Sequence, residues 1–470
     1  MMFLFTRILR YAVGTKENGN RRIYIQNFEF LNDVSFFPNS RFDITVTAKE
    51  IILKLNEVGQ RKVILSKRGD SIIELSDKLI TNFIGSCAKF VTVKLSNNEI
   101  RISHHHMEVQ RTIREFNFTK AIKRKELTTA SLYSGTGALS YTMGEGLKDA
   151  GFEPRIKFAN EIDEIAAKLN TSYNPIWDNA APDACFVMDD IQSMDMSVMP
   201  KYVDHLEISL PCPPYSALTS KDRRDIAHPL GKLFMRTTEA IARLNPATLT
   251  IECTTHLLNS NAFLCISDFL SLHGYSFETT VLKGTEFGDF EQRKRFCLFA
   301  VSSGLKGLFP SLNKIDLLHH INPQTFADIK DDIPEDSPLW KEFGHVKKRD
   351  SMPHLNYRNV LIGDKDKSMP ALLASSSPKA GAPFVCHPSN PNLQRQITVE
   401  EHTKIRKFPE RLAQATNKLG KGLLPGQVRT NKTAAHKLLG NSVCPGPWRT
   451  LMFYMFSGLH TNNAKQIGLF

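Results

Sequence analysis

The chain has 470 residues, of which 41% are apolar and 23% charged, and its 60 basic and 48 acidic side chains give a net charge of +12. This composition is typical of globular proteins and excludes a disordered, collagenous or low-complexity chain, and the length predicts about three domains. No apolar run reaches about 18 residues and Arg7 and Arg10 interrupt the N-terminal apolar stretch, so we expect no transmembrane helix, no secretion and a cytoplasmic location.

Residues 1–120 are predicted to form a β-rich accessory domain. Apolar and polar residues alternate in segments such as 22–26, 42–46 and 90–95, and turn sequences separate these segments. The domain carries 19 basic and 12 acidic side chains, a net charge of +7. This charge suits contact with phosphates, but a structural or partner-binding domain is an equal alternative. A basic helix is predicted over 107–126.

Residues 121–303 are predicted to form a doubly wound α/β domain with a parallel sheet, because short apolar strands alternate with helical stretches. Residues 121–300 carry 18 basic and 23 acidic side chains, a net charge of −5. The predicted strands cover 128–133, 155–159, 184–188, 205–210, 247–252, 277–283 and 295–301. The predicted helices cover 137–151, 161–170, 232–244 and 260–273.

The rest of the chain falls into two parts. Residues 304–394 contain several prolines and an acidic run, have a net charge near zero, and are predicted to form a loop-rich region. Residues 395–470 are predicted to be helical again over 398–418 and around 431–440. The final 75 residues carry 11 basic and 3 acidic side chains, so the basic excess of the chain lies in its two flanks.

The eight cysteines contain no C-x-x-C pair, so they are expected to be free thiols in a reducing compartment. The triplet His104-His105-His106 has no partner at metal-binding spacing and is interpreted as a loop feature. We therefore expect no metal.

Candidate ligand-binding residues follow the first three strands of the α/β domain. Tyr133-Ser134-Gly135-Thr136-Gly137 stands between a strand and a helix, where glycines let the backbone approach a nucleotide. Glu161 follows the second strand and is placed to accept ribose hydroxyls, and Asp190 follows the third and is placed to accept from an adenine amino group. A plain tight turn and a helix-capping acid are the structural alternatives.

Reactive side chains follow the next strands. Cys212 lies between prolines in Pro211-Cys212-Pro213-Pro214 at the exit of the fourth strand, which suits a positioned nucleophile better than an inert buried thiol. Glu252 ends the fifth strand, one strand away from Cys212, and Arg293 and Arg295 enter the last strand. Taken singly, such acids and basic runs are usually solvated surface groups.

In this order and spacing, the segments resemble the DNA (cytosine-5) methyltransferases over about residues 128–303 and 395–457. The matching motifs are Tyr133/Gly135/Gly137 for F-x-G-x-G, Pro211-Cys212 for Pro-Cys, Glu252 for the acid of Glu-Asn-Val, Arg293 and Arg295 for Q-x-R-x-R, residues 397–409 for L-T-x-R-E … F-P, and Leu439-Gly440-Asn441-Ser442-Val443 for the last motif.

The resemblance implies a Rossmann-like, S-adenosylmethionine-dependent methyltransferase fold and methyl transfer to C5 of a cytosine flipped out of duplex DNA. Cys212 would form a covalent adduct at C6, Glu252 would interact with N3, and Arg293 and Arg295 would lie near the base and phosphates. The implied cofactor-binding residues are Tyr133, Gly135, Gly137, Glu161, Asp190, Pro211, Asn441 and Val443.

The resemblance also implies roles outside the catalytic residues. Residues 304–394 would be the target-recognition region, and 395–470 would return to the catalytic domain. The candidate DNA contacts are Lys221, Arg223 and Arg224 in the loop after Cys212, and Lys347, Lys348 and Arg349, with His345 and Arg358, in the recognition region. The implied setting is a prokaryotic cell, with a plasmid or phage as one source of the gene. Double-stranded DNA and a companion restriction endonuclease would be the partners.

Four departures from the family pattern stand out. Cys253 replaces the family's Asn, Glu291 its Gln and Tyr133 its Phe, and Ser209-Leu210 replaces glycines. Activity is expected because the nucleophile, acid and arginines are present. The alternatives are an RNA cytosine-5 methyltransferase, a DNA-binding regulator with an inactive methyltransferase fold, and a nicotinamide-dependent oxidoreductase. The motifs with Glu252 and the two arginines favour DNA, whereas the missing third glycine disfavours the oxidoreductase.

Overall fold

The computed structural model describes residues 6–85, 88–96, 98–216, 219–350, 352, 360–374 and 382–460. Contacts divide this part of the chain into two units, one extending to Ile113 and one beginning at Arg114. The division falls inside helix α3 (His106–Arg124), seven residues before the predicted domain boundary at 120.

The N-terminal unit is built on antiparallel strands, and its predicted β-rich character is confirmed. The sheet order is β5-β3-β4-β9-β8-β1-β2-β7-β6. The strands are β1 (Arg7–Thr15), β2 (Arg21–Gln26), β3 (Arg41–Val46), β4 (Glu50–Leu55), β5 (Arg61–Lys62), β6 (Ile64–Leu65), β7 (Ser71–Leu75), β8 (Phe90–Ser96) and β9 (Glu99–His104). Two short helices, α1 (Phe28–Asp33) and α2 (Lys78–Ile84), join the strands in an apolar core.

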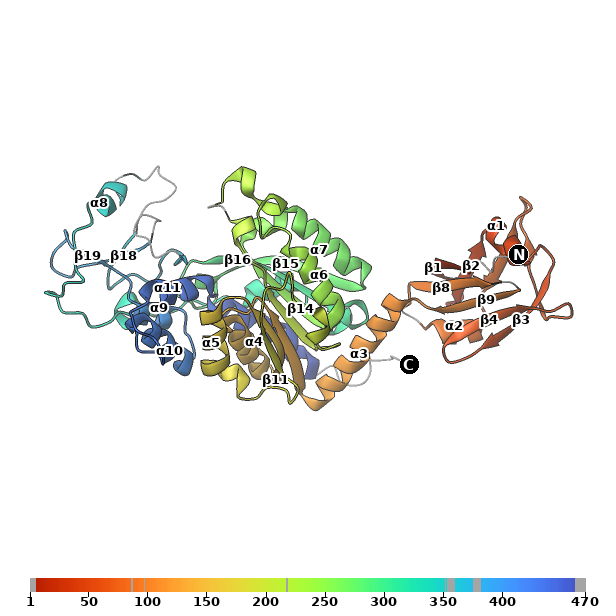
Figure 1. Ribbon diagram of the computed structural model, residues 1–470, viewed down its shortest axis with the longest axis horizontal. Coiled ribbons are helices and arrows are strands. Elements are labelled where there is room, and N and C mark those ends of the chain that lie inside the picture. The colour runs from red at the N-terminus through yellow and green to blue at the C-terminus, as the bar shows by residue number, and fades with distance from the viewer. Residues whose placement is uncertain are drawn as a thin grey trace. The chain divides into compact units, whose positions relative to one another are not determined.

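The second unit contains a seven-stranded sheet of order β12-β11-β10-β13-β14-β16-β15 (Figure 1). The strands are β10 (Glu126–Leu132), β11 (Glu153–Glu161), β12 (Cys185–Met188), β13 (His205–Ser209), β14 (Thr248–Cys253), β15 (Tyr275–Lys283) and β16 (Lys294–Ser302). The prediction of a wholly parallel sheet is wrong at β16, which runs antiparallel to β14 and β15. Only about ten residues separate β15 from β16, too few for the crossover that parallel strands need.

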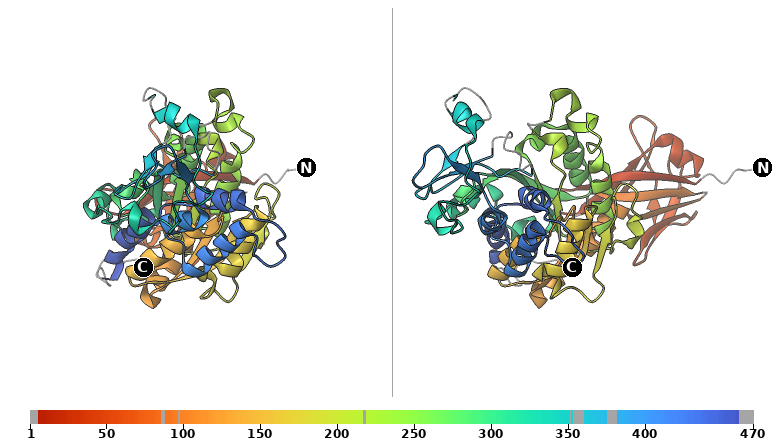
Figure 2. Two further views of the ribbon diagram at one scale, coloured as in Figure 1. Left: turned by 90° about the vertical axis from the view of Figure 1, so that its left-hand side faces the viewer. Right: turned by 60° about the vertical axis from the view of Figure 1, so that its left-hand side comes forward.

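Helices cover both faces of this sheet, and apolar side chains of the strands pack against them in one cluster on each face (Figures 1 and 2). Helices α6 (Leu233–Leu244) and α7 (Asn261–Leu272) pack on one face. Helix α4 (Ala138–Asp149), the second half of α3 and the C-terminal helix α12 (Pro445–Phe456) pack on the other. Helix α5 (Glu164–Tyr173) follows β11. The core therefore has two apolar layers with the sheet between them.

Arg114 fastens the second half of α3 to this unit. The buried guanidinium donates to Ser302 Oγ at 2.9 Å, to Asn245 Oδ1 at 3.2 Å and to the carbonyls of His273 and Gly274 at 2.7 and 2.9 Å. It also lies 3.8 Å from the ring centroid of Tyr275. Because a buried guanidinium needs such partners, this position is fixed with respect to the sheet.

The C-terminal segment returns to the sheet as four helices: α9 (Val399–Ile405), α10 (Glu410–Lys421), α11 (Lys432–Asn441) and α12. The helical stretch predicted over 398–418 consists of two helices, because Lys407 has a φ of +48° and Pro409 cannot donate a helical hydrogen bond. Helix α10 packs beside α5 (Figure 1). Helix α12 packs along α4, and Arg449 binds Asp149 at 2.6 Å.

Residues 304–394 contain little regular structure in their described part, as expected from the sequence. They hold helix α8 (Gly344–Asp350) and a small sheet of β17 (Leu361–Ile362), β18 (Phe384–Cys386) and β19 (Gln394–Gln396). An apolar cluster that includes Phe326 and Trp340 packs this region against Phe290 before β16 and against Ile397 and Ile405 at α9.

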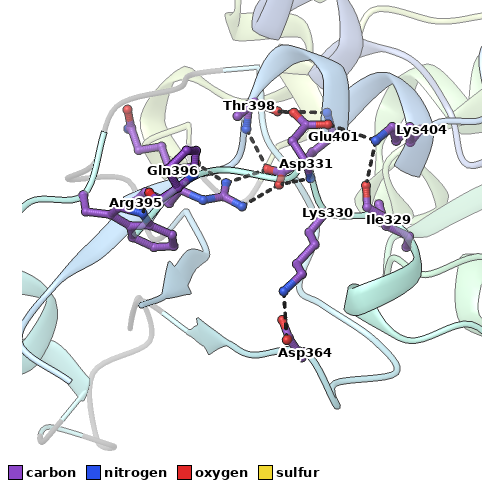
Figure 3. A network of polar contacts seen from close by, with 11 residues as sticks. Ile329, Lys330, Asp331, Asp364, Arg395, Gln396, Thr398, Glu401 and Lys404 are labelled. Carbon is purple, nitrogen blue, oxygen red and sulfur yellow. Dashed lines mark hydrogen bonds and ion pairs between the residues drawn. The ribbon is translucent and has the colours of Figure 1, made fainter. Parts of the chain in front are cut away.

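A polar network fastens this region to α9 (Figure 3). Buried Glu401 accepts two hydrogen bonds from Arg395, at 2.6 and 2.7 Å, and one from the backbone of Asp331 at 2.9 Å. The Asp331 carboxylate binds Lys404 at 2.9 Å and accepts from Thr398 Oγ1 at 2.5 Å.

Within the described residues, no helix is long and apolar enough to cross a membrane.

Candidate active site

The glycine loop after β10 adopts left-handed backbone conformations. Tyr133, Gly135 and Gly137 have φ values of +57°, +53° and +74°. A Cβ on Gly137 would lie 2.6 Å from side-chain atoms of both Asn170 and Asn174, so only glycine fits there. On Gly135 a Cβ would meet no atom within 4 Å, so the loop is open to a ligand at that residue.

Two buried asparagines, Asn170 in α5 and Asn174 at the C-cap of α5, hold this loop, and sequence reasoning missed them. Asn170 Nδ2 donates to the Gly135 carbonyl at 3.0 Å, and Asn174 Nδ2 donates to the Thr136 carbonyl at 2.9 Å. Both side chains are fully buried. Their signal in the sequence is the repetition of a polar amide at helical spacing on the buried side of α5.

Glu161 lies at the edge of the loop. Its carboxylate accepts from the backbone N–H groups of Gly135 at 2.7 Å, Ile162 at 2.9 Å and Asp163 at 2.8 Å. Met188, at the end of β12, pairs with Glu161 across the sheet, and Asp190 follows two residues later. The side chains of Ile162 and Met188 are 64% and 55% exposed, so they offer apolar surface next to the two acids. Sequence reasoning also missed this pair.

Cys212 lies three residues after Ser209, the last residue of β13. The pairing of β13 with β14 extends one residue further, because the Leu210 N–H donates to the Glu252 carbonyl at 3.0 Å, and this holds the segment before Cys212 against β14. The thiol is half-buried, and its Sγ atom lies 3.9 Å from that of Cys253. The hydrogen bond from Cys253, together with the positive charges of Arg295 and Arg293, lowers the pKa of Cys212, against the effects of burial and Glu252. A lowered pKa raises the thiolate fraction that a nucleophile requires.

Glu252 and Arg295 form an ion pair next to Cys212. Arg295 Nε lies 2.8 Å from Glu252 Oε1, and Ser209 Oγ donates to Glu252 Oε2 at 2.7 Å. Glu252 is 3% exposed, so the carboxylate is held in one position by two partners from neighbouring strands. The structure thus brings together three of the predicted catalytic side chains, Cys212, Glu252 and Arg295.

Arg293, the fourth predicted catalytic residue, makes its hydrogen bonds outside the cluster of Cys212, Glu252 and Arg295. Its guanidinium is buried and donates to the carbonyls of Leu372 at 3.2 Å and Gly440 at 2.9 Å. It therefore joins the entry of β16 to the segment that contains Leu372 and to α11. Its charge still acts on Cys212, but its hydrogen bonds are those of a structural residue.

The structure explains why Glu291 can stand where the resembling family has Gln. The Glu291 carboxylate binds the Arg406 guanidinium at 3.0 Å, both side chains are fully buried, and Glu291 also accepts from the Leu372 backbone at 2.8 Å. A charged residue at 291 is therefore matched by an opposite charge on α9.

The remaining predicted residues lie on several surfaces. Lys221 and Arg223 are exposed in the loop after Cys212, whereas Arg224 donates to the Thr219 carbonyl at 2.7 Å. Lys347, Lys348 and Arg349 belong to α8, where Lys348 is exposed; the side chains of 347 and 349, and Arg358, lie outside the described part. Pro211 is half-buried beside Cys212, Asn441 is exposed at the end of α11, and Val443 is buried in the core.

Comparison with known proteins identifies the family. The profile of the C-5 cytosine-specific DNA methylases matches residues 127–452. The chain belongs to this family. A curated relative, the Type II methyltransferase M1.BsuMI of Bacillus subtilis (strain 168), is 26% identical over 227 residues, 45% of this chain and 51% of the relative. The chain thus spans about half the length of that relative.

Solved structures show the same fold. The Dnmt2 methyltransferase of S. pombe has a TM-score of 0.52 at 15% identity and covers 72% of this chain and 100% of its own. The methyltransferase EhMeth of Entamoeba histolytica has a TM-score of 0.54 at 19% identity and covers 70% and 98%. The predicted Rossmann-like methyltransferase fold is confirmed.

The methylase family uses S-adenosylmethionine, and the residues present fit that cofactor. The open side of the loop at Gly135 would admit close approach of the cofactor, and the Glu161 carboxylate at the edge of the loop would accept hydrogen bonds from its ribose hydroxyls. The exposed apolar side chains of Ile162 and Met188 can cover a purine ring. Among the described residues, no group of three or more His, Cys, Asp or Glu side chains is arranged to hold a metal ion.

Proposed function

We propose that the chain is a DNA (cytosine-5) methyltransferase that acts on a flipped-out cytosine through a covalent bond to Cys212. The observation that carries this proposal is the cluster of Cys212, Glu252 and Arg295 at the ends of β13 and β14, beside the glycine loop of β10. Adjacent parallel strands of an open sheet bring a nucleophile, an acid and a cofactor loop to one edge.

In the proposed reaction the Cys212 thiolate adds to C6 of cytosine, and the electron pair of the C5–C6 bond becomes available at C5. Glu252, held by Arg295 and Ser209, must carry a proton for this step: its carboxyl O–H donates to N3, which is an acceptor, and stabilises the charge that develops on the ring. S-adenosylmethionine supplies the methyl group that C5 receives. Loss of the C5 proton to a base then restores the double bond and expels the Cys212 thiolate. The base must leave the stack first, which costs a few kcal/mol.

The DNA-contacting surfaces belong to the proposal. Lys221 and Arg223 would meet phosphates next to the flipped base, and the region 304–394, fixed on α9 by Glu401 and Asp331, would read the target sequence. The name of the Bacillus subtilis relative, a Type II methyltransferase, supports a role beside a companion restriction endonuclease in a prokaryotic cytoplasm.

Bisulfite sequencing of DNA from cells that express the chain tests this function and gives the target site. We expect 5-methylcytosine at one short sequence with the intact chain and none with Cys212→Ser. Cys265→Ser serves as the matched control, because Cys265 is an exposed thiol on α7. Purified protein with labelled cofactor is offered duplex DNA and RNA in parallel. Labelling of RNA alone would establish an RNA methyltransferase instead, and DNA binding without methylation would establish an inactive regulator.

A further inference from the structure

The thiol of Cys253 stands where the family pattern has an asparagine amide, and it is the neighbour of the proposed nucleophile. Cys253 is the last residue of β14, directly after Glu252, and its side chain is fully buried among Tyr215, Leu257 and other apolar residues. Its Sγ atom lies 3.9 Å from Cys212 Sγ, within the range of a hydrogen bond between sulfur atoms.

The two thiols differ in their surroundings. Burial, together with the contact to Cys212, raises the pKa of Cys253 well above its usual value, so this thiol keeps its proton. Cys212 lies close to Arg295 and Arg293, and its pKa is lowered. When the pair holds one proton, Cys253 is therefore the protonated thiol and Cys212 is the thiolate.

We propose that Cys253 is a positioning residue that donates an S–H hydrogen bond to the Cys212 thiolate and so sets its reactivity. This inference rests on the proposed role of Cys212 as the nucleophile. In its thiol form Cys212 donates to the Leu210 carbonyl, at 3.8 Å, and that bond is lost on ionisation. The donor from Cys253 favours the ionised form and fixes the sulfur at the end of β13.

The same bond acts at the end of the reaction. When C5 loses its proton, Cys212 leaves as a thiolate, and a thiol of lower pKa leaves more readily. Cys253 therefore favours both the population of the attacking thiolate and its departure. Its effect should be found in kcat rather than in the KM for the cofactor, because Cys253 lies in the apolar core next to Cys212 and not in the glycine loop.

Three variants test the donor: Cys253→Ala removes it, Cys253→Val removes it while keeping the volume, and Cys253→Ser restores a donor as a hydroxyl. Alkylation of Cys212 by iodoacetamide is followed against pH, in reductant-free buffer after prior reduction. It is quantified by mass spectrometry on the peptide that carries Cys212, so other exposed thiols do not contribute. Circular dichroism and the melting temperature show that each variant is folded. If Cys253→Ala does not fold, Cys253→Val takes its place.

We expect the midpoint of the alkylation profile to rise by about half a pH unit or more in Cys253→Ala or Cys253→Val and to fall back in Cys253→Ser. A folded donor-free variant with the wild-type midpoint, or a Cys253→Ser profile equal to that of Cys253→Ala, would overturn the inference. Because alkylation needs no methyl transfer, a shifted midpoint in a chain that methylates nothing would contradict the proposed function alone. In an active chain, kcat at pH 7 should fall with the same order of variants.

Discussion

Gly440 lies where α11 packs closely against two other segments, so closely that a single added side-chain atom would clash. A Cβ there would lie 2.4 Å from the backbone of Leu373 and Ala374, while the Gly440 carbonyl accepts from Arg293 at 2.9 Å. We expect Gly440→Ala to destabilise the second unit by about 2 kcal/mol or more, because backbone atoms cannot move aside as a flexible side chain can. Thermal unfolding measures this. Gly307→Ala, with no atom within 4 Å of its Cβ, is the control and should melt near the wild type.

Glu207 gives the fold a pH dependence. This carboxyl lies 4% exposed on β13 next to Ser140 of α4, and burial raises its pKa to about 7. The folded pKa lies above the unfolded value, so the contribution of Glu207 to stability is complete below about pH 4.5 and is lost as pH rises to about 7. Glu207→Gln should therefore gain stability relative to the wild type over this range, by on the order of 3 kcal/mol.

Unfolding of both proteins in urea at pH 4.5, 6 and 8 checks this prediction. The quantity of interest is the difference in free energy of unfolding at each pH, because other titrating groups affect both proteins equally. A difference that stays constant from pH 4.5 to 8 would show that Glu207 does not titrate in this window.

At this scale, the sequence was sufficient for residues whose chemistry is local to a strand end. Cys212, Glu252 and Arg295 follow recognisable motifs and come together. The partners that fix them were out of reach, because they come from distant segments. Asn170 and Asn174 contact the loop only once α5 has packed, and Arg293 finds its carbonyls 79 and 147 residues away. Nothing in a motif indicates such pairs.

Among the elements, α9 and the entry of β16 are joined by one buried ion pair, Glu291–Arg406. Removing either charge leaves the other buried without compensation, so Glu291→Gln and Arg406→Met should each cost about 3 to 5 kcal/mol. The double variant should cost at least about 1 kcal/mol less than the sum of the two. A double-mutant cycle in denaturant measures the difference.

The exposed pair Arg411–Asp178 is the matched control for this cycle. It also joins two segments, at 2.7 Å, but both side chains are about half exposed. Its removal should cost less than about 1 kcal/mol, because water screens and replaces an exposed pair. Costs of equal size at the two pairs would show that burial does not decide the value of Glu291–Arg406.

Element positions were predictable because hydrophobic period and turn residues are local signals. The seven strands and four helices of the α/β domain lie within about three residues of their predicted positions. Strand direction was not predictable from the same signals. Strand β16 is buried and largely apolar like β14, and its opposite direction follows from the short connection after β15. The break between α9 and α10 has a local signal, Pro409, which stands two residues after Lys407 with its positive φ.

For the whole molecule, the distribution of charge predicts how DNA affinity depends on salt. The N-terminal unit carries exposed cations at Lys54, Lys67, Arg68 and Lys94. If these side chains meet phosphates, replacing all four by Gln should reduce the slope of log affinity against log salt by up to about 3 to 4. Fluorescence anisotropy with duplex DNA at several salt concentrations measures the slope. An unchanged slope would show that these four side chains do not contact DNA phosphates.

The packing of α12 on α4 has a consequence for the order in which the protein is made. Arg449 and Asp149, which join these helices, are 300 residues apart. At about 5 to 20 residues per second, the ribosome needs about 15 to 60 seconds to deliver the partner after α4 has been synthesised. During this time Leu139, Met143 and Leu147 of α4 lack the C-terminal part of their core. The nascent chain therefore exposes an apolar helix face, which chaperones can bind, until its final helix leaves the ribosome.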